Sequence, residues 1–543
     1  MDLLVYMSQN PGHVHTRDDL LEHVWSGMVV SDEALTNAII KLRKAFNDDA
    51  RHPRFIETLS KRGYRLIAAV SPNGTSEQAN NQPVSDRALE ATGKQPIVTR
   101  KWFFTLASIF FIIVVAAFAP WFMQDVQETI QLPSEPLGLP LPDKPSIAVL
   151  PFINTGNEIE HSYFSDGITD DLITDLSSLS GLFVISRNST FQYKGRADDA
   201  KQVAKTLGVR YILEGSVRRI DERVRVNTRL VNGASGEQLW AERYDGNLQD
   251  VFKLQDRINA KIISALAIHL TEQDQAQLAI SETLNPKAYD EFLRGWERHW
   301  RVTREDFAQA EIHFKKALEL DPGFYRAHAA LAFIYWQSWQ QMWHFNSGNR
   351  GAGWVRARRE LDLAMVHPTP LAHSLLSAMQ LYNRRYDESI TEAERAVSLN
   401  PSSATGYLAL AEAHVFAGRP NEAITAAKKA FRLDPNFPAP YAFVEALALF
   451  SLQQYDKAIT LLQRAVSAKP EFNEALIVLI AAYGQLGRMN DASPVQERLN
   501  QRLVSGKLPR LTIDWQKHRW PYQHEADRNR LFEGLKKAGV PEW

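Results

Sequence analysis

The 543-residue chain contains no cysteine. Disulfide bonds, thiolate metal sites and a cysteine nucleophile are therefore excluded, and any metal would need histidine and carboxylate ligands. The chain also lacks an excess of either charge, since 62 Lys and Arg oppose 63 Asp and Glu, giving a formal net charge of -1. No global field attracts nucleic acid or a membrane, so any charged site must be local.

Familiar catalytic motifs are missing as well. The sequence holds no Walker phosphate loop, no GxSxG nucleophile elbow and no HExxH zinc motif. With 45% hydrophobic and 23% charged residues, its composition is globular, and its length suits roughly three or four domains. We expect no enzymatic activity, no catalytic residues, no cofactor and no metal.

One long apolar run interrupts the chain. Residues 102–123 hold no charged side chain over 22 positions, enough at about 1.5 Å per residue to cross a hydrocarbon core of about 30 Å. This run predicts a transmembrane helix, with a buried core helix as the alternative. Arg100 and Lys101 precede it, whereas Asp125 and Glu128 follow, so we expect the N-terminal part in the cytoplasm.

The residues before this run show helical periodicity. Leu3, Leu4 and Met7 share one face of a first helix, and Thr16 with Asp19 offers the N-cap of a second. A third helix begins at Ser31. Its core face is predicted to carry Leu35, Ile39, Leu42 and Phe46, and its outer stripe Asn37, Lys41 and Lys44, with Thr36, Ile40 and Arg43 beside it.

The stretch ETLSKRGYRL, residues 57–66, predicts a β-hairpin with a turn at Lys61-Arg62-Gly63. From Lys41 to Arg65 there are eight Lys or Arg against three acids. A helix beside a basic hairpin suits DNA, because the helix can read base edges while the hairpin holds phosphates. In this reading Asn37 contacts adenine and Lys41 guanine. A solvated charged face is the alternative.

The segments NPGHVHTRDDLLEHVW, VVSDEALTNAIIKLRKAF and DDARHPRFIETLSKRGYRL closely resemble the winged helix-turn-helix domain of OmpR/PhoB-type response regulators and of membrane-anchored ToxR/CadC-type regulators. The resemblance runs from residue 1 to about 68. It implies that the third helix is the recognition helix and the hairpin is the wing. The DNA-binding residues implied are Asn37, Lys41, Arg43 and Lys44 on the helix and Lys61, Arg62 and Arg65 on the wing.

Two features depart from that family. The family has an antiparallel sheet before its first helix, whereas this chain begins within that helix, so we expect an N-terminally truncated winged helix-turn-helix. No receiver domain with an acidic phosphorylation pocket precedes it, so we expect the signal to come through the membrane. The polar residues 71–99 predict a flexible tether between the DNA-binding domain and the membrane.

After the apolar run, a buried strand at SIAVLPF opens an alternation of helices and strands that predicts a small α/β domain. The order IAVLPF, YFSDGITDDLITDL, LFVISRNSTF, YILEGSVRR and GEQLWAERYDG resembles a module placed before TPR repeats in bacterial regulators and some adenylate cyclase-like proteins. That module is related to the TolB amino-terminal fold, and the resemblance implies an accessory or sensory domain.

This domain contains two weaker candidate sites, one for a cation or acid–base chemistry and one for an anion. His161, Asp166, Asp170, Asp171 and Asp175 could bind a cation or perform acid–base chemistry, although helix capping, the helix dipole and solvation explain the acids better. A carboxylate-dependent hydrolase would need Asp166 or Asp170. The polar loop 186–189 could receive an anion, and a polar strand-to-helix loop explains it equally well.

The remainder repeats itself. Pro368, Pro401, Pro435 and Pro470 are 33, 34 and 35 residues apart, a period that indicates TPR repeats. Four to six helical pairs would form a solenoid that binds a peptide or protein. Small residues are expected at helix contacts, and four tryptophans around an insertion are expected to pack within helices, with a ligand cleft as the alternative. The small residues are Ala411, Ala423, Ala430, Ala446, Ala458 and Ala465. The tryptophans are Trp336, Trp339, Trp343 and Trp354.

The predicted fold class is thus multidomain: a truncated α+β winged helix-turn-helix, a single transmembrane helix, a small α/β domain and an all-α TPR solenoid. The expected boundaries are 1–69 for the DNA-binding domain, 70–101 for the linker, 102–123 for the span, 124–143 for a Pro-rich spacer, 144–271 for the α/β domain, 285–505 for the TPR repeats and 506–543 for a C-terminal cap.

We expect a bacterial one-component transcriptional regulator of the inner membrane, with a cytoplasmic DNA-binding domain and a periplasmic sensory and protein-interaction region. Its expected partners are double-stranded DNA, the membrane, a protein or peptide on the TPR surface, and a second copy on DNA, because one winged domain covers little DNA. The alternative is a membrane-anchored TPR scaffold whose truncated winged helix no longer binds DNA.

Overall fold

The structure is a computed structural model of the chain. Residues 1–128 and 129–543 form two separate compact units, each described by itself below. The structure describes residues 2–9, 12–16, 19–20, 35, 39, 42–43, 46, 48, 53–59, 63–68 and 139–543, the last range without 157–161, 197, 281–282, 342–349, 437 and 507.

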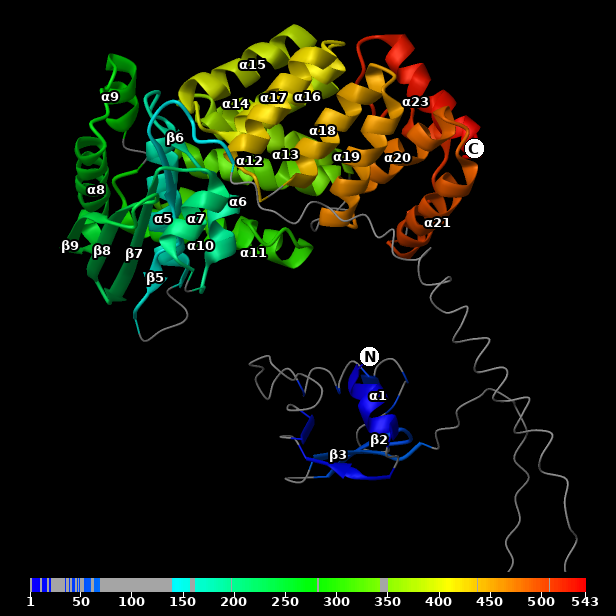
Figure 1. Ribbon diagram of the computed structural model, residues 1–543, viewed down its shortest axis with the longest axis horizontal. Helices are drawn as coiled ribbons and strands as arrows, with labels where there is room; N and C mark the ends of the chain where they lie inside the picture. Colours follow the sequence, from blue (N-terminus) through cyan, green and yellow to red (C-terminus); the bar gives the residue numbers. More distant parts are fainter. Residues whose placement is uncertain are drawn as a thin grey trace, which may run out of the picture. The chain divides into compact units, whose positions relative to one another are not determined.

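The N-terminal unit pairs helices with a small antiparallel sheet (Figure 1). Helix α1 spans Asp2–Gln9, and the strands are β1 (Val14–His15), β2 (Ile56–Leu59) and β3 (Gly63–Leu66), in the order β1-β3-β2. The predicted hairpin is confirmed, with Leu59 opposite Gly63. Its core contains most of the predicted apolar positions, since Leu3, Met7, Leu20, Leu35, Ile39, Ile56, Tyr64 and Leu66 are buried together.

The predicted transmembrane helix at 102–123 lies outside the described residues. Within the described ranges, no helix combines the length and apolarity needed to cross a membrane. The longest helices there have 17 residues and carry charged side chains. The fold class is therefore corrected: the described residues form a winged-helix unit, a sheet domain and a TPR-like helical solenoid, and none of their helices can cross a membrane.

The second unit begins with a six-stranded mixed sheet. Strands β6 (Phe183–Val184), β4 (Ser146–Val149), β7 (Tyr211–Ile220), β8 (Arg223–Asn232) and β9 (Gln238–Asn247) lie in that order, and β5 (Ile153–Asn154) also pairs with β7. Strand β4 is parallel to both of its neighbours, β6 and β7. Strand β8 is antiparallel to both of its neighbours, β7 and β9. Strand β4 is buried throughout, as its apolar sequence predicts.

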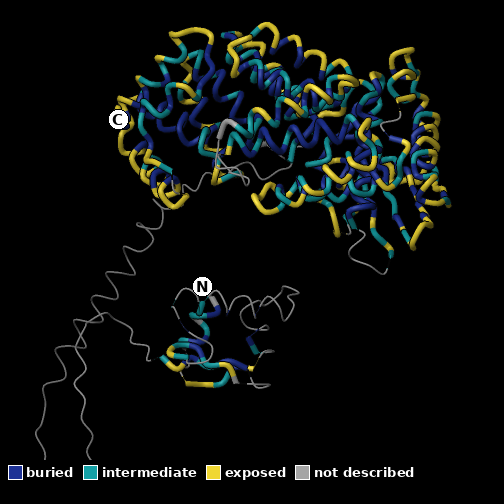
Figure 2. The backbone as a smooth tube through the Cα atoms, turned by 180° about the vertical axis from the view of Figure 1, so that it is seen from behind, coloured by how far each residue is buried: buried dark blue, intermediate teal, exposed yellow. Residues whose placement is uncertain are grey.

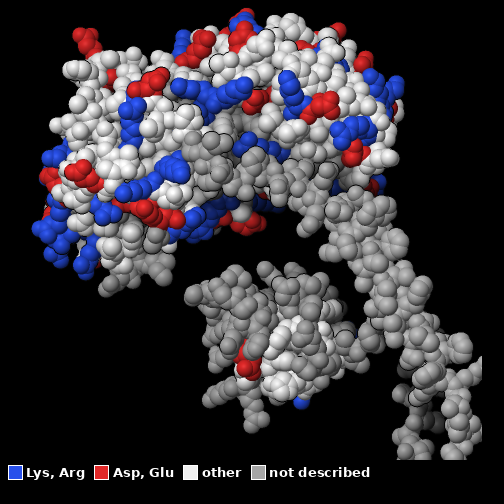
Figure 3. All heavy atoms as spheres, viewed as in Figure 1, with Lys and Arg blue, Asp and Glu red and all other residues white. Residues whose placement is uncertain are grey.

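Helices cover this sheet unevenly. Helices α5 (Ser162–Ser177) and α8 (Val251–Ala265) share a core with it, while the short α6 (Arg187–Thr190), the 3-10 turn Phe191–Tyr193 and α7 (Ala200–Leu207) follow β6. A 3-10 turn at Leu248–Asp250 and helix α9 (Glu272–Leu278) complete the domain. The outer positions of β8 stay exposed and polar, and Figure 3 shows Lys and Arg side chains gathered at this end of the unit.

A solenoid of six helical pairs follows, all within the described residues, and Figure 1 shows its helices stacked side by side. The alanines predicted at helix contacts are fully buried. The pairs are α10 (Pro286–His299) with α11 (Arg304–Leu320), α12 (Tyr325–Gln340) with α13 (Arg350–Ala364), α14 (Pro370–Tyr382) with α15 (Tyr386–Leu399), α16 (Ala404–Phe416) with α17 (Pro420–Leu433), α18 (Pro438–Ser451) with α19 (Tyr455–Ala468), and α20 (Asn473–Gln485) with α21 (Met489–Ser505).

The last segment folds back over several repeats. After α22 (Ile513–Gln516), Trp520 and Tyr522 are buried, and the Gln523 amide donates to the Phe416 carbonyl at the end of α16. Helix α23 (Glu525–Lys537) packs on α20 at Gly484, where a Cβ would lie 1.9 Å from the Gly534 carbonyl oxygen. Figure 2 shows the buried residues along the middle of these helices.

Candidate functional site

Of the seven residues predicted to contact DNA, Arg43 and Arg65 are described, and Asn37, Lys41, Lys44, Lys61 and Arg62 lie outside the described residues. Arg43 lies at the base of the hairpin. Its Nη2 donates to the Ile56 carbonyl and to the Thr58 hydroxyl, both at 2.8 Å. This side chain therefore ties the predicted recognition helix to β2, and a contact with DNA remains a prediction.

Arg65 lies opposite Glu57 in the hairpin and forms an ion pair with it, with Nε 2.9 Å from Oε2. Both side chains are about one third exposed. A phosphate would have to replace Glu57 as the partner of Arg65, which is feasible because exposed pairs contribute little stability. Gly63 begins β3 with φ +130°, and a Cβ there would lie 2.0 Å from the His15 carbonyl oxygen.

Asp48 fixes the start of the hairpin. Its carboxylate accepts the amides of Arg54, Phe55 and Ile56 at 2.6, 3.3 and 2.9 Å. Burial opposes its ionisation, but these three donors, with Arg43, lower the pKa of Asp48 below its ordinary value. Asp48, which lies between the predicted recognition helix and the wing, therefore has a structural role: it holds the backbone at the start of the hairpin.

The acidic helix α5 is buried against the solenoid. Asp171 accepts Arg326 Nη1 of α12 at 2.7 Å, Gln255 Nε2 of α8 at 3.0 Å, and the hydroxyl of Tyr289 of α10. Arg326 also lies over the Phe292 ring, 4.8 Å from its centroid. One carboxylate thus connects three helices of the two domains, and we call this region the acidic joint, defined by Asp166, Asp170, Asp171, Arg187, Lys194 and Arg326.

The other two carboxylates of the acidic joint are also paired. Asp170 accepts the indole N–H of Trp296 and lies 3.6 Å from the Arg187 guanidinium. Asp166 pairs with Lys194 at 2.5 Å. Burial raises the pKa of Asp170 and of Asp166 despite these cations. Three carboxylates therefore face three cations.

Solvation was the wrong reason for these acids, because Asp166, Asp170 and Asp171 are only 5 to 7% exposed. Asp166 is not an N-cap either, because α5 begins at Ser162. Most of their partners lie far along the chain, and several come from the solenoid. His161 is outside the described residues, and the described part of the chain contains no group of His, Asp and Glu able to hold a metal ion. The cluster stabilises the joint between the domains.

The loop 186–189 does receive an anion, and that anion belongs to the chain itself. Asp434, fully buried between α17 and α18, accepts the Ser189 hydroxyl at 2.6 Å, the Asn188 amide at 3.0 Å and the Tyr441 hydroxyl at 2.8 Å. The Ser186 amide donates to the Leu433 carbonyl at 2.8 Å. The fourth and fifth helical pairs are thus fixed to the end of β6.

The tryptophans around the insertion form a packed cluster. Trp336, Trp339, Trp354 and Tyr382 have ring centroids 5.1 to 6.5 Å apart. Rings at these distances touch one another and leave no cleft between them. The packing interpretation is confirmed for these side chains, and Trp343 lies outside the described residues.

Glu412 on α16 lies close enough to Tyr382 to influence its ionisation, and it has no ion-pair partner among the described residues. Burial raises the pKa of Glu412 from 4.5 to about 7. A raised pKa means that the folded state binds the proton more tightly, so this group's contribution to stability falls as the pH rises from 4.5 to 7.

Glu412→Gln is expected to remove this loss of stability, on the order of 3 kcal/mol at pH 8 relative to pH 4.5. Urea unfolding at both pH values measures it. The exposed Glu394→Gln should keep the original pH dependence. Parallel pH profiles for the parent and Glu412→Gln would contradict this assignment.

Comparisons with known proteins agree with this architecture. Residues 1–66 match the family "Transcriptional regulatory protein, C terminal", and residues 143–261 match "HilA/YgeH-like transcriptional regulator, second domain". Residues 443–499 match "Tetratricopeptide repeat", and residues 382–465 match "Anaphase-promoting complex, cyclosome, subunit 3".

Among curated proteins, the chain is 41% identical over 254 residues to "Putative adenylate cyclase 3" of Rhizobium meliloti (strain 1021), covering 46% of this chain and 42% of that protein. It is 24% identical to "Transcriptional activator CadC" of Escherichia coli (strain K12), covering 45% of this chain and 51% of that protein. With "Cholera toxin transcriptional activator" of Vibrio cholerae, identity is 33%, covering 18% of this chain and 41% of that protein. The chain spans about half or less of these relatives.

Similar solved structures include the one titled "Functional Characterization of Pseudomonas Aeruginosa pilF", with 18% identity and a TM-score of 0.29, covering 43% of this chain and 93% of that one. A thermophilic TPR protein of Thermus thermophilus has 17% identity and a TM-score of 0.29, covering 36% of this chain and 98% of that one. The family matches and the curated regulators together confirm the predicted resemblance to ToxR/CadC-type regulators with an OmpR/PhoB-type winged helix-turn-helix domain and TPR repeats.

Proposed function

We propose that the chain is a one-component transcriptional regulator that binds DNA through the winged helix and reports on a ligand or protein partner through the sheet domain and the solenoid. The match of residues 1–66 to a transcriptional regulatory domain carries this proposal. The hairpin supports it, because β2 and β3 flank a basic turn in the sequence, Lys61-Arg62-Gly63.

The second unit is proposed to act as one body. The acidic joint and the Asp434 contacts attach the sheet domain to the solenoid at two separate places. A partner that binds either domain would therefore affect both. Pairing of two copies on DNA remains part of the proposal, since one winged domain contacts few base pairs.

We also propose that the chain is not an enzyme. The carboxylates that could have supported hydrolysis are neutralised by Lys194, Arg187 and Arg326. One relative is described as an adenylate cyclase, and the chain spans 42% of its length. Assaying the purified chain for cyclic AMP formation from ATP tests this point, and turnover would refute it. Location in the bacterial inner membrane stays a prediction that cell fractionation would check.

The proposal predicts salt-sensitive DNA binding that depends on the wing. Binding of the full chain to genomic DNA fragments should become weaker in the Lys61→Ala/Arg62→Ala/Arg65→Ala variant. The slope of log K against log salt should flatten by about 0.9 for each phosphate that the variant no longer neutralises. Electrophoretic mobility shifts at two salt concentrations measure both effects.

The charge-matched control replaces Lys205, Lys457 and Lys537, which are exposed in the second unit, and should bind like the parent. Equal binding by the wing variant and the parent would remove the wing from the interface. Failure of every variant and the parent to bind would favour the second candidate, a TPR interaction scaffold, which the match to tetratricopeptide repeats supports.

A further inference from the structure

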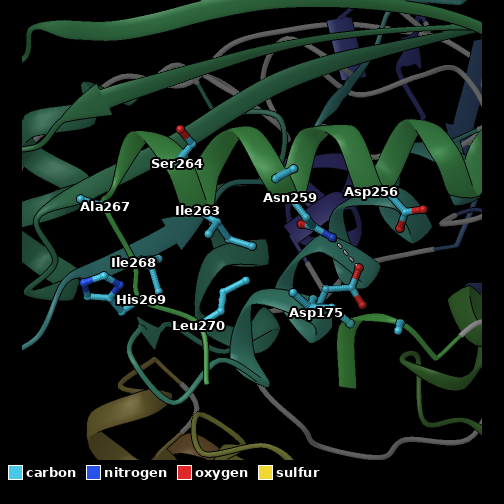
Figure 4. A pocket seen from close by; sticks show the side chains of 12 residues that line it. Asp175, Asp256, Asn259, Ile263, Ser264, Ala267, Ile268, His269 and Leu270 are labelled. Atoms are coloured by element: carbon cyan, nitrogen blue, oxygen red, sulfur yellow. Dashed lines mark hydrogen bonds between the residues drawn. The ribbon is translucent and has the colours of Figure 1, made fainter. Parts of the chain in front are cut away.

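A pocket of about 610 Å³ opens in the sheet domain between the end of α5, helix α8 and the segment that leads through α9 (Figure 4). Its volume lies within the usual range for small-molecule sites. Aliphatic side chains form most of its wall, including Ile263, Ile268, Leu270 and Leu278. Such a wall favours a ligand with an apolar body.

The carboxylates and the carboxamide of the pocket are concentrated at one end, whereas Ser264 and His269 lie toward the other. Figure 4 shows Asp175, Asp256 and Asn259 together at the first end, and His269 at the opposite end. Asn259 donates Nδ2–H to Asp175 Oδ2 at 2.7 Å, which fixes the orientation of its amide. This end therefore presents oxygen acceptors and negative charge.

One of these acceptors is buried and unsatisfied. Asn259 is 4% exposed, and its Oδ1 has no hydrogen-bond partner among the described residues. A buried acceptor left unpaired costs about 1 to 3 kcal/mol, and because Asn259 lines the pocket, a donor that entered this end would relieve that cost. The exposed Asp256 has no ion pair among the described residues, and desolvation by the neighbouring atoms raises its pKa.

We propose that this pocket binds a small organic monocation, with its ammonium group at Asp256 and Asn259 and its apolar body along Ile263 and Leu270. An ammonium carries donors only and a positive charge, which complements an end made of acceptors and carboxylates. The far end offers His269 and no carboxylate, so it favours a ligand with a single charge. This inference concerns the sheet domain and does not depend on DNA binding.

Isothermal titration of the full chain with hexylamine tests the proposal. We expect one saturable site, with hexan-1-ol and hexanoate binding at least about tenfold more weakly because the first lacks the charge and the second reverses it. 1,6-Diaminohexane should bind no more tightly than hexylamine. Tighter binding of the diamine would overturn the single-charge assignment, and equal binding of hexan-1-ol would overturn the ionic contact.

The matched variants are Asp256→Asn and Glu272→Gln. Both residues are exposed, so neither change threatens folding, but only Asp256 lines the pocket. Asp256→Asn should weaken hexylamine binding by about tenfold, and Glu272→Gln should leave it unchanged. No saturable binding by the parent, or unchanged binding by Asp256→Asn, would refute the proposal. DNA binding by the same preparation distinguishes this failure from failure of the proposed regulator.

Discussion

Replacing Arg326 by methionine is expected to lower the free energy of unfolding of the second unit by about 3 to 5 kcal/mol. Methionine retains the apolar contact with Phe292 but removes the cation that faces Asp171 at 2.7 Å. A buried carboxylate would then remain without its cation, which costs far more than the pair itself contributes. Urea unfolding followed by tryptophan fluorescence, to which Trp296 beside the same guanidinium contributes, measures the change.

Adding Asp171→Asn to Arg326→Met should recover a large part of the loss, because the amide leaves no buried charge and still accepts from Gln255 or Tyr289. Arg358→Gln is the control, since Arg358 pairs with Asp362 on the surface. This change should alter the free energy of unfolding by less than about 0.5 kcal/mol. A loss of equal size in the single and double variants would show that charge burial is not the cause.

Replacing Asp434 by alanine is expected to cost roughly 3 to 5 kcal/mol, because the buried hydroxyls of Ser189 and Tyr441 and the half-buried amide of Asn188 would lose their acceptor. The sheet domain should separate locally from the solenoid before the whole unit unfolds. Hydrogen exchange of the Ser186 amide, which donates to the Leu433 carbonyl, reports this separation directly.

The exposed Asp456→Ala is the control for this change and should leave exchange at Ser186 unaltered. Asp434→Asn should have a smaller effect than alanine, because an amide oxygen still accepts hydrogen bonds. The contrary result is that the Ser186 amide exchanges as slowly in the Asp434→Ala variant as in the parent. The contact between the end of β6 and the solenoid would then depend on the apolar cluster that includes Ala404 and Tyr441.

Local periodicity predicted most elements correctly. The buried strand at 146–149, helix α5, the three long antiparallel strands and the proline-terminated solenoid helices all follow from patterns within a few residues. Helices α6 and α9 were not predicted, because four and seven residues are too few to establish a helical period. The transmembrane helix predicted at 102–123 lies outside the described residues, and no helix of the described residues is long and apolar enough to cross a membrane.

The environment of the acids could not be predicted in the same way. Asp171 meets Gln255, Tyr289 and Arg326, which lie 84, 118 and 155 residues further along the chain. A helix with three acids has the same local sequence whether it faces water or another domain. The one usable sign was Gly167, where α5 comes so close to α10 that a Cβ would lie 2.5 Å from Leu293.

The pocket was missed for a related reason. Asn259 and Asp256 look like ordinary polar positions of an amphipathic helix, and Asp175 lies 84 residues before Asn259. Only the fold shows that the Asn259 oxygen is buried without a donor among the described residues. The loop at 186–189, by contrast, was considered as a place for an anion, and the sequence could not reveal that Asp434 supplies it.

Because Ser189 and Asp434 are 245 residues apart, the contact between them can form only after most of the solenoid has been synthesised. Repeat arrays ordinarily fold by nearest-neighbour contacts as each unit is synthesised. Here the loop after β6 leaves the ribosome about 10 to 50 s before its acceptor, at typical bacterial rates. During this interval the sheet domain lacks the contacts that the fourth and fifth helical pairs make with the end of β6.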